Sequence, residues 1–395
     1  MVIDTSVPAY TFSRVGGSLK RSVMRDLLKH AVDPNILSLA GGLPAADALP
    51  VAEYAECLQT VIARDGAKAL QYAPMSAALR EWIAGYMQQR GVACTPDQVF
   101  ITNGNQQGLT ILARLFLNPD DTALIENIVF TGVQQSVQAA DARIIALPTD
   151  PVHGLDLDAL ETGMKRGAKL AIVIPDFHNP LGVSLSSESR QRIADMAAHY
   201  GVPVIEDDAY SALRFAGSAL APVKAYDRAG WVFYLGSFSK MLAPGLRLGW
   251  MIVPEDLMPR IQVMREAIDL ESSTLTQRAV AEYVTTYGLR HLPRLRTLHH
   301  ERYIALNHAL ETHFGERATW THPEGGLFMW LTLNEPIDTW ALLDRAIKAG
   351  VVYIPGNAFA IQGGADNTMR LNFSTLPADK IAQAVERLAE VIKGS

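Results

Sequence analysis

Between about residues 97 and 254, short apolar runs alternate with longer stretches in which apolar residues recur every three or four positions. A short apolar run bounded by turn residues predicts a buried strand, and the longer periodicity predicts an amphipathic helix. Because parallel strands need helical crossovers, this alternation predicts a parallel or mostly parallel sheet covered by helices. The expected strands lie within residues 98–104, 122–130, 142–148, 169–177, 202–210, 230–240 and 246–254.

The pattern differs at both ends of the chain. Residues 20–32 place apolar side chains on one helical face, and residues 35–44 are typical of a short extended segment with a glycine turn, so we expect an arm before the main body. After about residue 285, basic helical sequence is followed by apolar runs at 325–333, 350–356 and 368–374 and by an amphipathic C-terminal helix, which predicts a smaller α+β domain. The expected division is 1–45 for the arm, which joins the small domain, 46–285 for the large domain and 286–395 for the small C-terminal domain.

The composition agrees with this organisation. With 395 residues, the chain is long enough for a large domain and a smaller one. Apolar residues make up 49% and charged residues 19%, a balance typical of globular proteins. The formal net charge of −6 argues against a nucleic-acid-binding protein, since such domains usually carry a basic excess.

The cysteines and the hydropathy of the chain indicate whether to expect a disulfide, a metal site or a membrane helix. Cys57 and Cys94 are the only cysteines, and the sequence has neither a CxxC pair nor a His cluster at zinc spacing. We therefore expect no disulfide scaffold, no metal site and a reducing compartment. No apolar run reaches the roughly 18 residues of a membrane helix, and the start "MVIDTSVPAYTFSR" does not resemble a secretory signal, so we expect a cytoplasmic protein without a membrane partner.

Polar clusters directly follow several of the expected strands. They are Asn103–Gln107, Asn179, Asp207–Tyr210 and Ser237–Lys240. In sheets with parallel strands, ligands collect at the carboxyl ends of the strands. We therefore expect these clusters to lie at one edge of the sheet.

Each cluster also has a structural explanation when it is taken alone. Asn103 or Asn105 could cap a helix, and Asn179 before a proline fits an ordinary turn. Asp208 is a candidate for capping as well, and a lone lysine after a strand, such as Lys240, is most often a solvated surface residue. No single cluster therefore establishes a site.

Together the clusters indicate one ligand. A lysine amine, phosphate donors at a helix start, a carboxylate for a protonated ring nitrogen, and a tyrosine with an asparagine for a phenolic oxygen are the groups that pyridoxal 5′-phosphate requires. No Walker-type GxxxxGK or GxGxxG sequence supports a nucleotide site instead.

The motifs resemble those of the pyridoxal-phosphate aminotransferases of the aspartate aminotransferase fold. "SFSKMLAPGLRLG" matches the family pattern SxSKxxxPxxRxG, "HNPLG" matches NPxG and "DDAY" matches DxAY. "ILSLAGGLP", "LQYAP", "VIEDDAY" and "MRLNFS" are similar to the 2-aminoadipate, kynurenine and aromatic aminotransferase branch, which also supplies the effector domain of some winged-helix regulators. The resemblance runs from about residue 14 to the end and implies an α/β protein of fold type I, with a mostly parallel seven-stranded sheet in a large cofactor-binding domain and a smaller α+β domain.

The resemblance also implies a role for each cofactor-site residue. Lys240 would form the internal aldimine, the imine with the cofactor aldehyde, and Asp207 would pair with the pyridinium nitrogen. Tyr210 and Asn179 would hydrogen-bond the phenolic oxygen, and Phe130 would stack on the ring. The residues that would hold the phosphate are Gly104, Asn105, Gln106, Ser237, Ser239 and Arg247.

Further residues are implied for the substrate and a neighbouring subunit. Arg370 would bind the substrate α-carboxylate, Asn179 would be a further substrate-binding residue, and Gly42 would belong to the segment that closes on the side chain. Arg25 in the arm is a candidate for an acidic or polar substrate group, although an exposed helical arginine is the better explanation of this residue. Tyr72 would reach the phosphate of a neighbouring subunit, which implies a homodimer.

Two features depart from the family pattern. The loop "QYAPMSAALR" is about two residues shorter than usual and lacks the central glycine, which affects the pocket wall and the contact of Tyr72. Asn105 stands where serine, alanine or threonine is commoner, and its length affects the phosphate site.

The implied activity is transfer of an amino group between an L-α-amino acid and a 2-oxo acid. Two alternatives stay open at this point: a lyase, decarboxylase, cyclase or oxidase on the same fold, and a non-catalytic ligand sensor. The sensor is disfavoured because no winged-helix sequence precedes the arm. The motifs do not name the amino acid, since loops shape the side-chain pocket and the fold alone does not specify a reaction.

Overall fold

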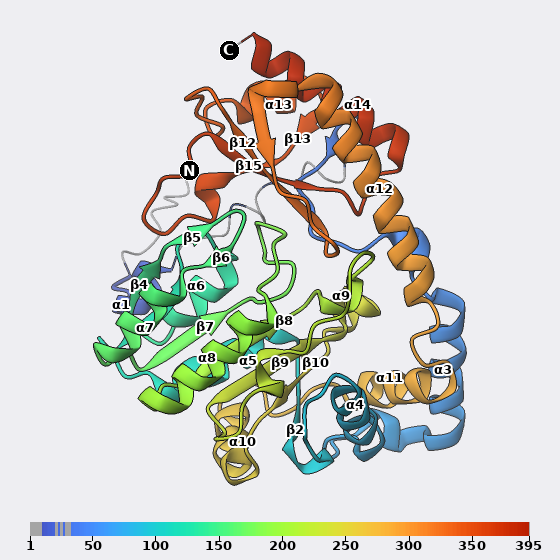
Figure 1. The fold of residues 1–395 in the computed structure, drawn as a ribbon. Coiled ribbons are helices and arrows are strands. Elements are labelled where there is room, and N and C mark those ends of the chain that lie inside the picture. Colours follow the sequence, from blue (N-terminus) through green and yellow to red (C-terminus); the bar gives the residue numbers. More distant parts are fainter. Residues whose placement is uncertain (1–9, 20–22, 24–26, 28–32, 395) are drawn as a thin grey trace, which may run out of the picture.

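The computed structural model describes residues 10–19, 23, 27 and 33–394. The predicted helix at 20–32 therefore lies mostly outside the described residues. Figure 1 shows two parts, a larger one around a wide sheet and a smaller one around a narrow sheet.

The larger sheet has seven strands in the order β2-β10-β9-β8-β7-β3-β4. β10 runs antiparallel to both of its neighbours, β2 and β9, and all other neighbouring pairs are parallel, so the prediction of a mostly parallel seven-stranded sheet is confirmed. Each strand comes from one of the seven predicted apolar runs. The strands are β2 (Val99–Thr102), β3 (Thr122–Glu126), β4 (Arg143–Leu147), β7 (Leu170–Val173), β8 (Val204–Asp208), β9 (Val232–Ser237) and β10 (Gly249–Ile252).

Helices cover both faces of this sheet because successive strand residues point to opposite sides. On β9, Phe233 and Leu235 pack into the core formed with α5, α6 and α10, whereas Val232 packs into the core formed with α7 and α8 and Tyr234 into that formed with α4 and α11. The helices of the larger part are α3 (Val51–Asp65), α4 (Ala77–Gln89), α5 (Asn105–Phe116), α6 (Thr131–Gln138), α7 (Leu157–Lys165), α8 (Ser187–Tyr200), α9 (Phe238–Met241), α10 (Met258–Glu266) and α11 (Thr274–Thr286).

The smaller part contains an antiparallel sheet in the order β11-β12-β15-β14. The long helix α12 packs Leu292 and Leu295 into the core of the larger part and Leu306 and Leu310 into that of the smaller part, and Figure 1 shows it running along both. The short strand β1 pairs in parallel with β13, which attaches the segment before the larger part to the smaller one. These elements are β1 (Leu37–Ser38), α12 (Leu292–His313), β11 (Ala318–Trp320), β12 (Phe328–Leu333), α13 (Leu343–Lys348), β13 (Val351–Val352), β14 (Ile354–Pro355), β15 (Thr368–Asn372) and α14 (Ala378–Lys393).

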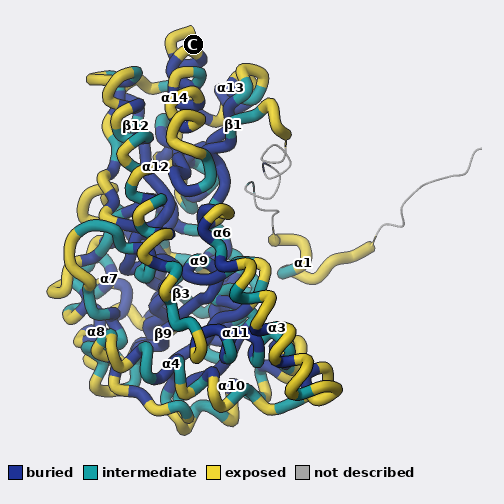
Figure 2. Tube along the Cα trace, turned by 90° about the vertical axis from the view of Figure 1, so that its right-hand side faces the viewer, coloured by how far each residue is buried: buried dark blue, intermediate teal, exposed yellow. Residues whose placement is uncertain are grey.

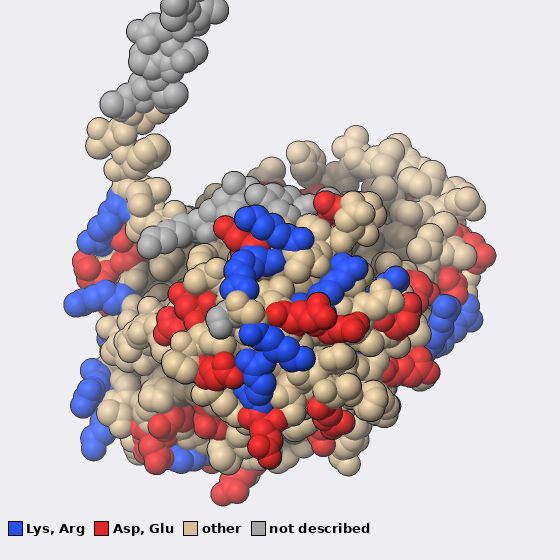
Figure 3. All heavy atoms as spheres, turned by 90° about the horizontal axis from the view of Figure 1, so that it is seen from above, with Lys and Arg blue, Asp and Glu red and all other residues tan. Residues whose placement is uncertain are grey.

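One further α-helix and two further strands of the described residues lie outside these two sheets. They are α1 (Arg14–Ser18) and the hairpin strands β5 (Thr149–Asp150) and β6 (Gly154–Leu155). Figure 2 shows a buried interior along the strands, with exposed segments on the outer helices, and Figure 3 shows basic and acidic side chains interspersed on one face. Among the described residues, no helix has the length and apolarity that crossing a membrane requires.

Candidate active site

One cavity of about 470 Å³ brings most of the predicted site residues together. Its walls come from the ends of β8 and β9, the start of α5, the segment that follows β1, and β12 and β15. Predicted residues that line it are Gly42, Asn105, Gln106, Phe130, Asn179, Asp207, Tyr210, Ser237, Ser239, Lys240, Arg247 and Arg370. Gly104 precedes this lining at the start of α5, Tyr72 does not line the cavity, and Arg25 lies outside the described residues.

Lys240 lies on the short helix α9, which begins directly after β9. Its Nζ donates a hydrogen bond of 2.6 Å to the carbonyl oxygen of Gly42. Burial lowers the pKa of the Lys240 amine to about 8, and the positive charges of Arg370 and Arg247 act in the same direction. The neutral amine, which a nucleophile or a general base requires, is therefore easier to reach near neutral pH than in an ordinary lysine.

Asp207 lies near the end of β8 and is buried. Burial raises the pKa of its carboxyl group to about 6; the hydrogen bond from Asn105 and the nearby His178 lower it, and Asp208 raises it. A buried carboxylate in this position is stabilised by a cation, since an opposite charge favours the ionised form. The site thus suits a protonated nitrogen in a ligand.

Asn179 connects the phenol of Tyr210 with the guanidinium of Arg370. Its Nδ2 donates to the Tyr210 hydroxyl at 3.4 Å, and its Oδ1 accepts from Nη1 of Arg370 at 2.9 Å. Burial raises the pKa of the Tyr210 phenol above its ordinary value. The three residues follow β7, follow β8 and lie on β15, so the contact joins the two parts of the fold.

The Arg370 guanidinium is fully buried, and no carboxylate of the described residues pairs with it. Its Nη2 donates to the carbonyl oxygen of Ala40 at 2.6 Å, its Nε has no hydrogen-bond partner, and its carbon lies 4.0 Å from the centroid of the Phe328 ring. Burial lowers its pKa to about 10. A buried guanidinium without an anion is suited to a carboxylate ligand, which it can bind with two parallel hydrogen bonds.

The start of α5 is suited to an anion. The N-cap position is Gly104, with φ of +86° and no side-chain cap, so the first backbone N–H groups of the helix stay available. A Cβ atom at Gly104 would lie 3.0 Å from Nη2 of Arg247, which places that guanidinium against the same turn. The interpretation of Asn103 or Asn105 as the helix cap is therefore wrong, because a glycine in the left-handed region takes that position.

Two more groups complete this end of the cavity. The Ser237 Oγ accepts from the backbone N–H of Ser239 at 3.1 Å, which fixes both residues at the start of α9. Gln106 donates through Nε2 to the carbonyl oxygen of Gly132 at 2.9 Å, and a Cβ at Gly132 would come within 2.1 Å of Gln106 Oε1. Hydroxyls, a guanidinium and a helix N-terminus together match a phosphate group.

The neighbouring polar residues have structural roles. Asp208 accepts from the backbone N–H groups of Tyr210 and Ser211 and pairs with Arg90 at 2.9 Å, which agrees with the capping interpretation. His178 Nε2 lies 3.1 Å from the Glu126 carboxylate, and both side chains are buried.

Some lining residues carry no signal of their role in the sequence. Phe328, which packs against both Arg370 and Tyr210, and Leu43 line the cavity but were not predicted. Phe328 begins the apolar run of β12, so its pattern is the same as that of a core strand residue.

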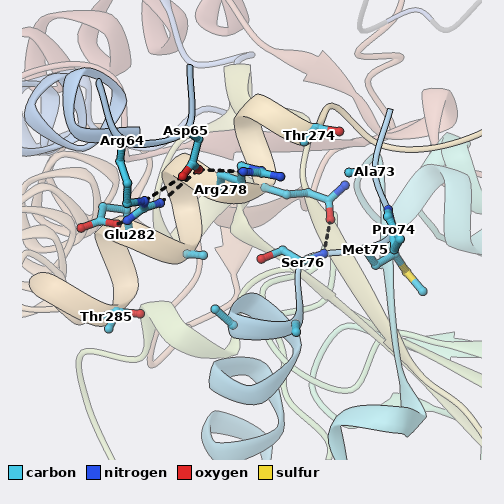
Figure 4. A pocket seen from close by; sticks show the side chains of 14 residues that line it. Arg64, Asp65, Ala73, Pro74, Met75, Ser76, Thr274, Arg278, Glu282 and Thr285 are labelled. Carbon is cyan, nitrogen blue, oxygen red and sulfur yellow. Dashed lines mark hydrogen bonds and ion pairs between the residues drawn. The ribbon is translucent and has the colours of Figure 1, made fainter. Parts of the chain in front are cut away.

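Tyr72 lies on the surface, and the residue is 78% exposed. It precedes a loop that borders a second pocket of about 560 Å³, shown in Figure 4. In that pocket the Asp65 carboxylate accepts from both Arg64 and Arg278, and Gln277 accepts from the backbone of Ser76 at 3.0 Å.

The residues of the cavity match each functional group of pyridoxal phosphate. The buried Asp207 carboxylate matches the ring nitrogen, the Tyr210 phenol matches the phenolic oxygen, and Lys240 matches the aldehyde. The glycine turn at the start of α5, with Arg247, matches the phosphate.

Comparison with known proteins agrees with this chemistry. The family model for aminotransferase class I and II matches residues 34–388. The chain is 36% identical to aromatic-amino-acid aminotransferase 1 of Thermococcus litoralis over 97% of this chain and 94% of that protein, and 35% identical to the 2-aminoadipate transaminase of Thermus thermophilus over 97% of this chain and 96% of that protein. The crystal structure of a kynurenine aminotransferase from Pyrococcus horikoshii, in complex with PMP, matches with a TM-score of 0.91 at 35% identity and 97% coverage of both chains, and the predicted aspartate aminotransferase fold is confirmed. The chain therefore belongs to the class I and II aminotransferases, which use pyridoxal phosphate to transfer an amino group between an amino acid and a 2-oxo acid.

Proposed function

We propose that the cavity around Lys240 is the site of transamination and that its residues act as the sequence motifs imply. The observation that carries this proposal is the convergence of three groups on one cavity: the amine of Lys240, the buried carboxylate of Asp207 and the buried guanidinium of Arg370. They come from α9, β8 and β15, so no local turn or cap explains their meeting.

The cofactor would be held at its two ends. Asp207 would pair with the ring nitrogen, and Tyr210 and Asn179 would hydrogen-bond the phenolic oxygen. Gly104, Asn105 and Gln106 at the start of α5, with Ser237, Ser239 and Arg247, would bind the phosphate, and Phe130 would cover the ring. When bound, pyridoxal phosphate supplies an aldehyde that condenses with amines and a ring that withdraws electrons from the substrate Cα.

Lys240 would move the proton. Its amine is partly neutral near neutral pH, so it can accept a proton from the substrate Cα and then donate one as a general acid. The carbonyl oxygen of Gly42 accepts a hydrogen bond from Nζ and orients the amine.

Arg370 would bind the substrate α-carboxylate. Phe328 and Phe359 pack against the guanidinium, and Asn179 and Ala40 accept its hydrogen bonds, so its orientation is set before the substrate arrives. A carboxylate held by two parallel hydrogen bonds fixes the direction of the Cα–H bond.

The substrates would be L-amino acids with apolar or aromatic side chains and the corresponding 2-oxo acids. The described lining contains three cations, Lys240, Arg247 and Arg370, and each already has a role in the proposal. Leu43, Phe130 and Phe328 supply apolar wall, which favours an apolar side chain over a second carboxylate. Arg25 lies outside the described residues and stays a candidate partner of an acidic or polar side chain, so 2-aminoadipate belongs in any test.

The direct test is to mix the purified holoenzyme with single L-amino acids and to follow the visible absorbance of the cofactor. We expect aromatic and large apolar amino acids to abolish the aldehyde-form band with release of the matching 2-oxo acid, and a second 2-oxo acid to restore it. A cofactor band that no amino acid changes would contradict the proposed site.

Arg370→Lys should weaken the binding of the substrate carboxylate. Lysine keeps the positive charge but lacks the planar guanidinium, so we expect kcat/KM for amino acids to fall about 10²-fold, mostly through a higher KM. The readout is steady-state kinetics with an amino acid and, separately, with an amine that lacks the carboxylate. An equal loss for both donors would contradict the carboxylate role.

A further prediction concerns a homodimer, which we infer from the surface around Tyr72. Tyr72 and Leu70 are large, exposed apolar side chains beside the pocket of Figure 4, and Tyr72 does not line the cavity of its own chain. A contact of Tyr72 with the phosphate therefore needs a second copy.

We expect analytical ultracentrifugation to show a particle of twice the 43.1 kDa chain mass. Tyr72→Glu should shift this equilibrium towards the monomer and weaken retention of the cofactor, because a charge would be buried without a partner. Trp340→Glu, at another exposed aromatic side chain, is the matched control and should leave the dimer intact. A monomeric parent protein would refute the inference.

The division of the chain and its location also stay proposals. The boundary near residue 286 is supported by its position at the end of α11, in the connection to α12, and the boundary near residue 45 by the pairing of β1 with β13. The cytoplasmic location is supported by two cysteines that are buried and unpaired.

A further inference from the structure

Asn105 makes a contact that its place in the phosphate site does not require. It is the first residue of α5, where the backbone faces the anion site. Its side chain instead donates through Nδ2 to Oδ1 of Asp207 at 2.6 Å and lies 3.4 Å from the carbonyl oxygen of Leu235 on β9. The Oδ1 atom of Asn105 is buried and has no hydrogen-bond partner.

The length of the asparagine side chain makes this contact possible. A serine hydroxyl at this position would end near the point that Cγ of Asn105 occupies. The hydroxyl would therefore end about 1.3 Å, the length of one amide C–N bond, short of the position of Asn105 Nδ2. The 2.6 Å distance to Oδ1 of Asp207 would then increase beyond hydrogen-bonding distance. The residue types that the resemblance gives at this position could therefore hold a phosphate but not reach Asp207.

The surroundings of Asp207 show what the contact does. Burial and the neighbouring Asp208 favour the protonated carboxyl group, whereas Asn105 and His178 favour the carboxylate. His178 itself lies against Glu126, and Asn105 is the direct hydrogen-bond donor to Asp207 among these groups. The amide therefore opposes the effect of burial at the carboxylate oxygen itself.

We infer that Asn105 is a positioning residue that keeps the shared proton on the cofactor's ring nitrogen by stabilising the ionised carboxylate of Asp207. This inference rests on the proposed function. Without the amide donor, the carboxylate is the better base, and the proton moves from the ring nitrogen to Asp207. The phosphate contacts of the α5 backbone do not depend on this side chain.

The test uses holoenzyme loaded with pyridoxal phosphate that carries ¹⁵N in its ring, with and without Asn105→Ser. We expect the pH at which the ring nitrogen signal changes from its protonated to its neutral position to fall by about one to two units in the variant. The ³¹P signal of the phosphate should keep its position. Asn103→Ser is the matched control, because Asn103 lies in the same turn but donates to Asp269, and it should not move the ¹⁵N signal.

The second measurement places Asn105→Ser in an Asp207→Asn background, where it should no longer affect the ring nitrogen. The inference would be overturned, with the proposed function left intact, if Asn105→Ser left the ¹⁵N titration unchanged. The same holds if Asn105→Ser shifted the titration equally in the Asp207→Asn background. A change confined to the ³¹P signal would overturn the inference as well, by making Asn105 a phosphate ligand only. Failure of the parent protein to take up the cofactor would overturn the proposed function together with the inference.

Discussion

Replacement of Lys240 by alanine is expected to lower kcat by about 10⁴-fold, the upper end of the range for loss of a general acid–base group. The described lining offers no second amine: its other cations are the guanidinium groups of Arg247 and Arg370, a type of group that does not serve as a base in proteins. The variant also loses the covalent link to the cofactor. Borohydride reduction followed by mass spectrometry should therefore show a phosphopyridoxyl adduct on the parent chain and none on the variant.

The fold should survive this substitution. Burial disfavours the charged form of the Lys240 amine, and the hydrogen bond that the amine donates goes to a backbone carbonyl oxygen. We expect the free energy of unfolding to change by no more than about 1 kcal/mol. Lys380→Ala, at an exposed lysine on α14, is the control that should retain full activity. An alanine variant at position 240 that turns over at the parent rate would refute the assignment.

The strands were predictable because their environment is uniform. Strands such as β7, β8 and β9 are buried along their whole length, and a parallel strand covered on both faces forms a continuous apolar run. The reversed direction of β10 was not predictable. Its run is equally apolar and fully buried, and strand direction depends on how the chain crosses from β9.

The site was predictable where it follows the strands of the large sheet. Asn179, Asp207 and Lys240 each come soon after an apolar run, and strand direction brings such positions to one edge. The contact of Arg370 with Ala40 was not predictable from pattern, because it joins residues 330 positions apart, where the backbone N–H of Asn372 on β15 donates to the carbonyl oxygen of Leu39 after β1. The role of Asn105 was also missed, since its local sequence fits a cap and its partner is a carboxylate on β8.

Asp207→Asn is expected to lower kcat by about 10² to 10³-fold, a loss typical of removing one preorganised electrostatic contact. Asparagine has nearly the same shape as aspartate, and its carbonyl oxygen can still accept from Asn105. What disappears is the negative charge that would hold a proton on the ring nitrogen. Steady-state kinetics would measure the loss, and Asp256→Asn, at an exposed carboxylate, is the control.

Although Asp207→Asn should lower activity, it should raise the stability of the cofactor-free protein. The pKa of Asp207 is about 6 in the fold and about 4 in an unfolded chain, so the native state holds a proton that the unfolded state releases. Stability from this group is present below pH 4 and is lost as the pH rises through 6. Because the asparagine side chain does not ionise, we expect the variant to be more stable than the parent above pH 6, by up to about 3 kcal/mol. Denaturant unfolding at pH 5 and pH 8 measures the difference, and a variant with lower stability at pH 8 would show that the buried carboxylate contributes to folding rather than to the cofactor site.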